Sequence, residues 1–132
     1  GETVPLAAVA GTPCDVYAPC AVGATLNEDS VPRLRCSIVA GAANNQLSEP
    51  GMAAELHARD ILYAPDYVIN GGGAMAFTSI YLGVDDLAEL DRRVGGIGES
   101  LERIFAEAAE RASSPVVAAQ AFVARVLQRG PA

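Results

Sequence analysis

The sequence of 132 residues predicts an α/β fold in which a partial parallel sheet of about three strands is followed by C-terminal helices. Three short segments contain β-branched or aromatic residues and end at proline or at glycine and alanine, which is typical of strands buried in a parallel sheet: residues 14–21, 36–41 and 61–65. After residue 65, apolar residues recur at helical spacing instead. Because 51% of the residues are apolar, the chain can bury the core of one domain.

A helix is predicted between the second and third strand segments, in residues 49–60. Met52, Leu56 and Ile61 lie near one helical face, and Pro50 suits a first helical turn. A strand, a helix and a strand in this order predict a right-handed parallel crossover.

The helical signals on either side of that crossover are weaker. Residues 22–35, which join the first two strand segments, predict only a short helical turn around residues 31–34, because Pro32 restricts the residue before it. Residues 66–83 have the apolar spacing of a buried helix. The glycines at 71–73 should weaken that helix.

Two further helices are predicted at the C-terminal end. Residues 85–112 are amphipathic, and the glycines at 95, 96 and 98 should loosen this helix or permit close packing. Its apolar stripe contains Leu87, Leu90, Val94, Ile97, Leu101, Ile104, Phe105 and Ala108. A final helix is predicted for residues 115–128. Its candidate caps are Ser113 and Ser114, and its stop signals are Gly130 and Pro131.

Composition argues against several classes of function. A net charge of −7 opposes unassisted binding to nucleic acid or to an anionic membrane. We expect neither a membrane span nor a signal peptide within these residues. Three cysteines without CxxC spacing fit reduced thiols, so we expect a cytoplasmic protein. The sequence starts at Gly1 rather than at methionine, and we expect it to be a piece of a longer chain.

The basic residues limit the chemistry further. All nine are arginine, which excludes a Schiff-base lysine, a lysine general base and a P-loop lysine from this sequence. The single histidine, His57, lies between Glu55 and Arg59 and has no partner at metal-ligand spacing. We therefore interpret His57 as a solvated side chain and expect no metal site.

The segment IVAGAANNQL, residues 38–47, places three amide side chains directly after a predicted strand. Open α/β sheets bind ligands at the C-terminal edge of their strands, so Asn44, Asn45 and Gln46 are predicted to line a cleft. Neutral amides can bind a carboxamide or a ribose, but they cannot act as acids or bases. The alternative is that all three are ordinary turn residues, since asparagine is common in turns.

Three motifs follow one another with characteristic spacing: VYAPCAVGATLN, VAGAANNQL and ILYAPDYVINGGG. Together they resemble the cofactor domain of the glutamate/leucine/phenylalanine/valine dehydrogenases, closest to the leucine, valine and phenylalanine branch. The resemblance is dense over residues 14–73 and weak in the C-terminal helices. It implies NAD-dependent oxidative deamination of a small apolar L-amino acid to its 2-oxo acid and ammonia.

The resemblance also implies an organisation and a set of site residues. Residues 1–67 would form the second half of a Rossmann-like dinucleotide-binding domain, and residues 68–132 would be helices that pack on it. Small residues at the site suit the close approach of the backbone to a cofactor. The implied NAD-binding residues are Cys20, Ala21, Ala42 and Asn44. The implied substrate-binding residues are Asn45, Ala74 and Phe77, where Asn45, like Gln46, has the alternative of capping the following turn.

The substrate pocket and the phosphate site raise separate questions. Phe77 stands where leucine enzymes typically have valine, and would narrow the substrate pocket.

The segment GGGAMA, residues 71–76, satisfies the G-x-G-x-x-G/A pattern of phosphate-binding turns. No second strand intervenes before Asp91, so we interpret these glycines as part of a helix rather than as a phosphate-binding turn.

Two parts of the family's machinery have no counterpart in this sequence. Members of the family use lysines and an aspartate on a separate N-terminal domain, and they bind the pyrophosphate on a glycine-rich turn. We therefore expect no catalytic residue in this chain, and we expect it to work with the missing N-terminal part or as a homo-oligomer.

Three hypotheses remain open. The chain is a fragment of an NAD-dependent amino-acid dehydrogenase, or it is a non-catalytic remnant that binds nucleotides or dimerises. The third is an enzyme of another class that uses Cys20, although no second histidine is available to activate the thiol.

Overall fold

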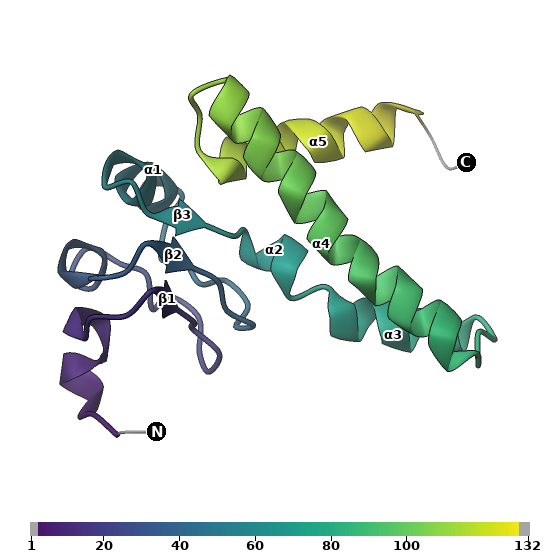
Figure 1. The fold of residues 1–132 in the computed structure, drawn as a ribbon, viewed down its shortest axis with the longest axis horizontal. Coiled ribbons are helices and arrows are strands. Elements are labelled where there is room, and N and C mark those ends of the chain that lie inside the picture. Colours follow the sequence, from purple (N-terminus) through teal and green to yellow (C-terminus); the bar gives the residue numbers. More distant parts are fainter. Residues whose placement is uncertain (1–2, 130–132) are drawn as a thin grey trace.

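The computed structural model describes residues 3–129 and places a small parallel sheet beside a group of helices (Figure 1). In chain order, with η for a 3-10 helix, the elements are η1 (Leu6–Gly11), β1 (Val16–Tyr17), η2 (Val31–Arg33), β2 (Ile38–Val39), α1 (Gly51–Ala58), β3 (Leu62–Tyr63), α2 (Asp66–Ile69), α3 (Gly72–Tyr81), α4 (Leu87–Glu110) and α5 (Pro115–Arg129). The three strands, the turn before β2 and the helix between β2 and β3 confirm the predicted α/β fold. None of the helices described between residues 3 and 129 has the length and apolarity that a membrane span requires.

The sheet is parallel, with the strand order β1-β2-β3. Tyr17, Val39 and Tyr63 are aligned across the three strands. Val39 and Tyr63 are buried in the core. Val16 and Leu62, which lie one position earlier in β1 and β3, are exposed. The prediction of fully buried strands is therefore wrong: each strand alternates, because only one face of the sheet is covered well.

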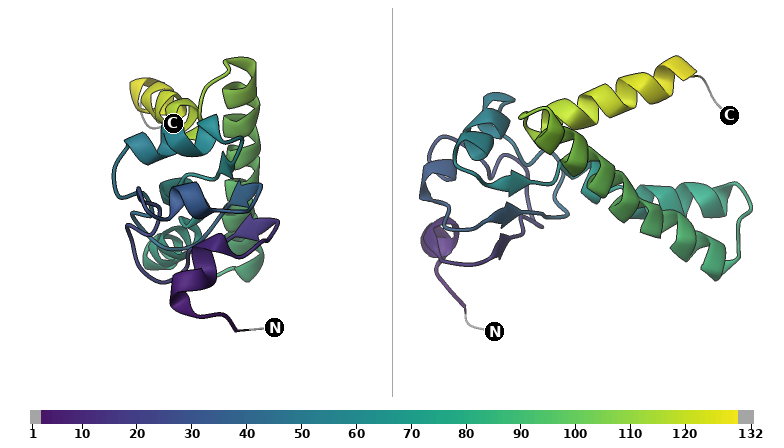
Figure 2. Two further views of the ribbon diagram at one scale, coloured as in Figure 1. Left: turned by 90° about the vertical axis from the view of Figure 1, so that its left-hand side faces the viewer. Right: turned by 45° about the horizontal axis from the view of Figure 1, so that its top comes forward.

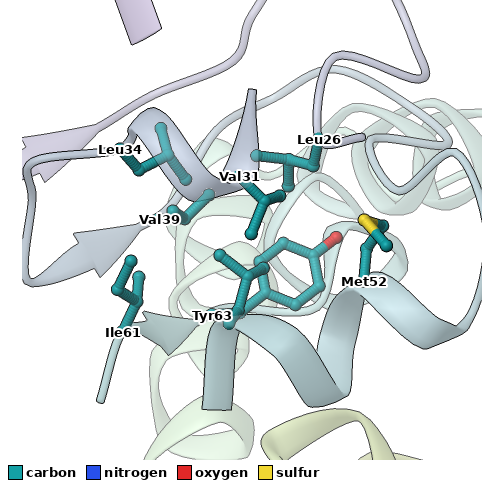
Figure 3. Close-up of a cluster of buried hydrophobic side chains, with 8 residues drawn as sticks. Leu26, Val31, Leu34, Val39, Met52, Ile61 and Tyr63 are labelled. Atoms are coloured by element: carbon teal, nitrogen blue, oxygen red, sulfur yellow. The ribbon is translucent and has the colours of Figure 1, made fainter. Parts of the chain in front are cut away.

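The main core lies between that buried face and α1. Met52 and Leu56 of α1 pack with Ile61, as their predicted shared face requires. Arg59 then ties the core to η2, since its guanidinium donates hydrogen bonds to the carbonyl oxygens of Val31 and Leu34. Figure 3 shows the cluster, whose buried members are Leu26, Val31, Leu34, Val39, Met52, Leu56, Ile61 and Tyr63.

The helix predicted for residues 66–83 is two helices, α2 and α3. The chain leaves α2 at Asn70 and resumes a helix at Gly72. The apolar spacing also does not lead to burial, because Ser79 is the one buried residue of α3. Glycine has the lowest helix propensity after proline, so the glycine triplet allows the break. The prediction of one buried helix is therefore wrong.

Helix α4 confirms the predicted long amphipathic helix, with exceptions along its stripe. Leu90, Ile104 and Ala108 are buried, but Leu87 is 80% exposed at the first turn. The three glycines within α4 do not mediate close packing, since a Cβ atom at any of them would meet no other atom within 4 Å. Close packing occurs instead at Gly72, where a Cβ would lie 3.3 Å from Cγ1 of Val94.

Helices α4 and α5 diverge from a shared corner and form a V, with α3 beside the other end of α4 (Figure 2). A second cluster fills the corner and contains Ile104, Ala108, Ala118 and Ala119. The Arg125 guanidinium donates two hydrogen bonds to the Glu107 carboxylate across the V. Of the two predicted caps, Ser114 accepts a hydrogen bond from the Val117 N–H at 3.5 Å. The predicted stop at Gly130 and Pro131 lies outside the described residues.

Candidate functional site

The C-terminal ends of β1 and β2 meet at one edge of the sheet. The Ala43 N–H donates to the carbonyl oxygen of Pro19 at 2.9 Å, and the Ala42 N–H donates to Sγ of Cys20 at 3.5 Å. Gly41 permits this approach, because a Cβ atom there would lie only 2.2 Å from the Pro19 oxygen. Cys20 and Ala42, both predicted to bind NAD, are therefore brought together, and both residues are exposed.

A third segment joins this edge from α2. The side-chain nitrogen Nδ2 of Asn70 donates to Oδ1 of Asn44 and, at 3.5 Å, to the carbonyl oxygen of Ala42. The sequence did not predict Asn70 as a site residue. Its position between apolar residues and the glycine triplet is the sequence feature that could have indicated it. The structure thus gathers Cys20, Ala42, Asn44 and Asn70 at one place, which we call the strand-end cluster.

Gln46 is not part of an open cleft. Its side chain is completely buried, and its Nε2 donates to the carbonyl oxygens of Gly41 at 2.7 Å and Ala43 at 3.0 Å. The prediction that three amides line a cleft is therefore wrong for Gln46, whose amide satisfies backbone acceptors in the loop. Asn44 and Asn45 remain exposed.

Asn44 and Asn45 lie against different neighbours. Asn45 has a positive φ of 52°, a conformation that asparagine tolerates well, and its carbonyl oxygen accepts a hydrogen bond from the Ala24 N–H at 2.7 Å. It lines an open hollow of about 270 Å³ together with Asp66 and Gln120. Its contribution to substrate binding stays a prediction.

The other predicted site residues are exposed on separate elements. Ala21 lies in the loop after β1. Ala74 and Phe77 belong to α3, which extends away from the sheet along α4 (Figure 1). Phe77 is 72% exposed in the described part of the chain. The structure therefore provides the helix that would carry a substrate-facing pair and leaves the Phe77 side chain largely exposed, and the roles of these residues stay predictions.

Asp66 connects the loop and α2 rather than capping the helix. Residue Pro65 occupies the cap position and makes no side-chain bond there. The Asp66 carboxylate accepts hydrogen bonds from the Gln46 N–H at 3.0 Å and from the Tyr67 N–H at 2.9 Å. Burial, followed by the nearby Asp66 charge, raises the pKa of the Tyr63 phenol well above its usual range. Tyr63 therefore stays neutral and does not act as a base at neutral pH.

The chemistry available at the strand-end cluster is neutral hydrogen bonding. Its groups are a thiol, backbone amides and carbonyls, and two side-chain amides. His57 lies elsewhere and lines a hollow with Asp60 and Phe105. Within residues 3–129 no group of three His, Cys, Asp or Glu side chains is placed to hold a metal ion. The cluster can bind and orient a polar ligand, and it contains no carboxylate, histidine or lysine side chain.

Comparisons with a family model and with individual proteins indicate the same family for this chain. The family model described as Glutamate/Leucine/Phenylalanine/Valine dehydrogenase matches residues 2–124. The chain is 45% identical over 92 residues to leucine dehydrogenase of Bacillus subtilis (strain 168), covering 70% of this chain and 25% of the enzyme. It is 45% identical over 105 residues to valine dehydrogenase of Streptomyces virginiae, covering 80% of this chain and 29% of that enzyme.

A solved structure agrees with the sequence relatives. L-tryptophan dehydrogenase from Nostoc punctiforme is similar to the chain with a TM-score of 0.83 and 37% identity, over 86% of this chain and 35% of that one. The chain thus spans about a quarter to a third of the length of these relatives. The match nevertheless includes the sheet, the strand-end cluster and most of the helices. The chain belongs to the glutamate/leucine/phenylalanine/valine dehydrogenase family.

Proposed function

We propose that this chain forms the nicotinamide side of the cofactor cleft in an NAD-dependent dehydrogenase that deaminates a small apolar L-amino acid. The reaction converts the amino acid, water and NAD⁺ into the 2-oxo acid, ammonium, NADH and one proton. The observation that carries the proposal is the convergence of Cys20, Ala42 and Asn44 at one sheet edge, in a chain of the dehydrogenase family. Relatives named for leucine, valine and tryptophan support an amino-acid substrate.

The exposed groups at this edge fit a dinucleotide. The small side chains of Cys20, Ala21 and Ala42 leave the backbone accessible for close approach. Asn44 uses Oδ1 toward Asn70, so its Nδ2 can donate to a ribose hydroxyl or a carboxamide oxygen. A bound NAD would supply the acceptor for the hydride that leaves the substrate Cα. The role of these residues is to bind and orient the nicotinamide ribose end.

The proton acceptor must come from outside this chain. Arginine remains protonated, so none of the nine basic residues can act as a general base. Asp15 precedes the end of β1, away from the loop that carries Cys20. The Asp66 carboxylate already accepts two backbone hydrogen bonds. We therefore infer that a lysine-bearing N-terminal part, on the same or another chain, supplies the acid–base groups.

Turnover measured with and without such a part tests the proposal. With NAD and leucine, valine or phenylalanine, we expect no turnover by the isolated chain and NAD affinity in the millimolar range or none, because the resemblance implies that the pyrophosphate-binding turn lies outside this sequence. Adding the lysine-bearing N-terminal part of a related enzyme should restore NADH formation. Asn44→Ala should then raise the KM for NAD, whereas Gln128→Ala, which changes an exposed amide on α5, should not. Turnover by the isolated chain, or micromolar NAD binding in calorimetry, would contradict the proposal.

A second candidate function is a non-catalytic module that binds nucleotides or dimerises. The observation in its favour is the exposed apolar surface of the α3 helix and the turn after it, where Ile80, Tyr81 and Leu82 are 58%, 81% and 72% exposed. Apolar patches of this kind commonly mark interaction surfaces. Light scattering tests the dimerising form of this candidate: a monodisperse monomer would remove it, and a dimer that Tyr81→Ser dissociates would support an interface on α3.

A further inference from the structure

We propose that Gln46 and Asp66 are positioning residues: Gln46 holds the loop of the strand-end cluster in shape, and Asp66 holds that loop against the start of α2. Neither residue touches the exposed groups that would meet the cofactor. Each instead binds the backbone that presents them. The inference deepens the proposed function, since a defined loop position matters most if Ala42 and Asn44 contact NAD.

Gln46 ties the loop to itself. Its Nε2 reaches back to the carbonyl oxygens of Gly41 and Ala43, which flank Ala42. Both acceptors lie in a buried environment, where an unpaired carbonyl is costly. Glutamine supplies the donor that these carbonyl oxygens need, because glutamate has no N–H to donate and methionine has neither polar group.

The Gln46 backbone ties the loop to two other segments. Its N–H donates to Oδ2 of Asp66 at 3.0 Å, and its carbonyl oxygen accepts from the Leu26 N–H at 2.9 Å. The other Asp66 oxygen, Oδ1, accepts from the Tyr67 N–H. One carboxylate therefore bridges the end of the loop and the first turn of α2.

The far end of α2 returns to the same loop. Asn70, which follows the last residue of α2, donates to Asn44 and Ala42. The short helix is thus bonded to the loop at its start through Asp66 and at its end through Asn70. Two attachments at opposite ends restrict both rotation and translation of the loop relative to α2. Loss of the Asp66 bond to the Gln46 N–H should leave the loop attached to α2 through Asn70 only, and loss of the Gln46 side-chain bonds should loosen the loop itself.

Amide hydrogen exchange of the full chain tests the positioning role. In Gln46→Met and in Asp66→Asn, we expect exchange at the Ala43 N–H to accelerate about tenfold, the effect of losing a buried hydrogen bond. Exchange at the Ala64 N–H, which donates to Val39 within the sheet, should stay unchanged. The matched control is Gln128→Met on exposed α5. If Gln46→Met does not fold, Asp66→Asn alone still tests the positioning role, because it alters a hydrogen bond to the same loop.

Two outcomes would overturn the proposal. One is unchanged exchange at Ala43 in both variants. The other is equal acceleration at Ala43 and Ala64, which would make the two residues general stabilisers of the fold. Failure of the proposed function would be seen separately, as a lack of turnover by the wild-type chain together with the lysine-bearing part. The hydrogen-exchange result does not depend on turnover. Where turnover is restored, both variants should raise the KM for NAD about tenfold.

Discussion

The side chain of Asn70, at the end of α2, donates a hydrogen bond to Oδ1 of Asn44, which lies 26 residues earlier in the loop after β2. The same Asn70 nitrogen also reaches the carbonyl oxygen of Ala42. This contact joins a helix end to the sheet edge and orients an amide that the family resemblance assigns to the cofactor.

Asn70→Ala should free the Asn44 side chain with little loss of stability. Because the contact is exposed, we expect the free energy of unfolding to fall by less than about 1 kcal/mol. The side-chain amide resonances of Asn44 should move and narrow in NMR spectra. Gln128→Ala serves as the control, and unchanged Asn44 resonances in Asn70→Ala would show that the hydrogen bond has no orienting effect.

Gly41→Ala and Gly95→Ala should have opposite effects on stability. An alanine Cβ at residue 41 would overlap the Pro19 backbone, so we expect a loss of about 2–3 kcal/mol or more. At residue 95, in the exposed interior of α4, a Cβ meets nothing, so alanine should stabilise by about 0.5–1 kcal/mol. Urea denaturation of both variants measures the difference. An unchanged free energy of unfolding in Gly41→Ala would mean that the ends of β1 and β2 can move apart with little loss of stability.

Tyr63→Phe should change the alkaline limb of the stability profile. Burial and then Asp66 raise the pKa of the Tyr63 phenol above its ordinary value of about 10. The folded state therefore keeps a proton that the unfolded state releases, so stability is fully present below about pH 10 and falls above it, by at most about 1.4 kcal/mol per pH unit for this group. Denaturation between about pH 9 and 11 should show a shallower decline in Tyr63→Phe than in the wild type. The exposed control Tyr81→Phe should decline like the wild type.

Glu107→Gln should weaken the packing of α5 on α4 in a pH-dependent way. The hydrogen bond from Arg125 lowers the pKa of the Glu107 carboxyl, so its contribution is present above the ordinary glutamate pKa of about 4.3 and is lost as the pH falls through the lowered value. We expect a lower Tm than the wild type at neutral pH and a difference that vanishes in acid. Glu99→Gln, which removes an exposed 3.5 Å pair with Arg103, should change the Tm less at any pH. An equal effect of both variants would argue against a special role for the α4–α5 pair.

Local patterns determined much of the architecture. Short apolar segments ending in small residues predicted all three strands, and helical spacing predicted α1, α4 and α5. These patterns are readable because side-chain spacing along one element decides which face it can bury. The three linked motifs also indicated the dehydrogenase family, which the family match and the relatives confirm.

Tertiary contacts decided what the local patterns could not. Spacing favoured one buried helix over residues 66–83, yet the chain breaks at Asn70, where the side chain finds partners in the loop after β2. Three consecutive amides looked equivalent, but Gln46 is buried on backbone carbonyls while Asn44 and Asn45 stay exposed. The physical reason is that a polar side chain takes its role from the donors and acceptors it meets, and here these come from segments distant in sequence that only the folded sheet edge brings together.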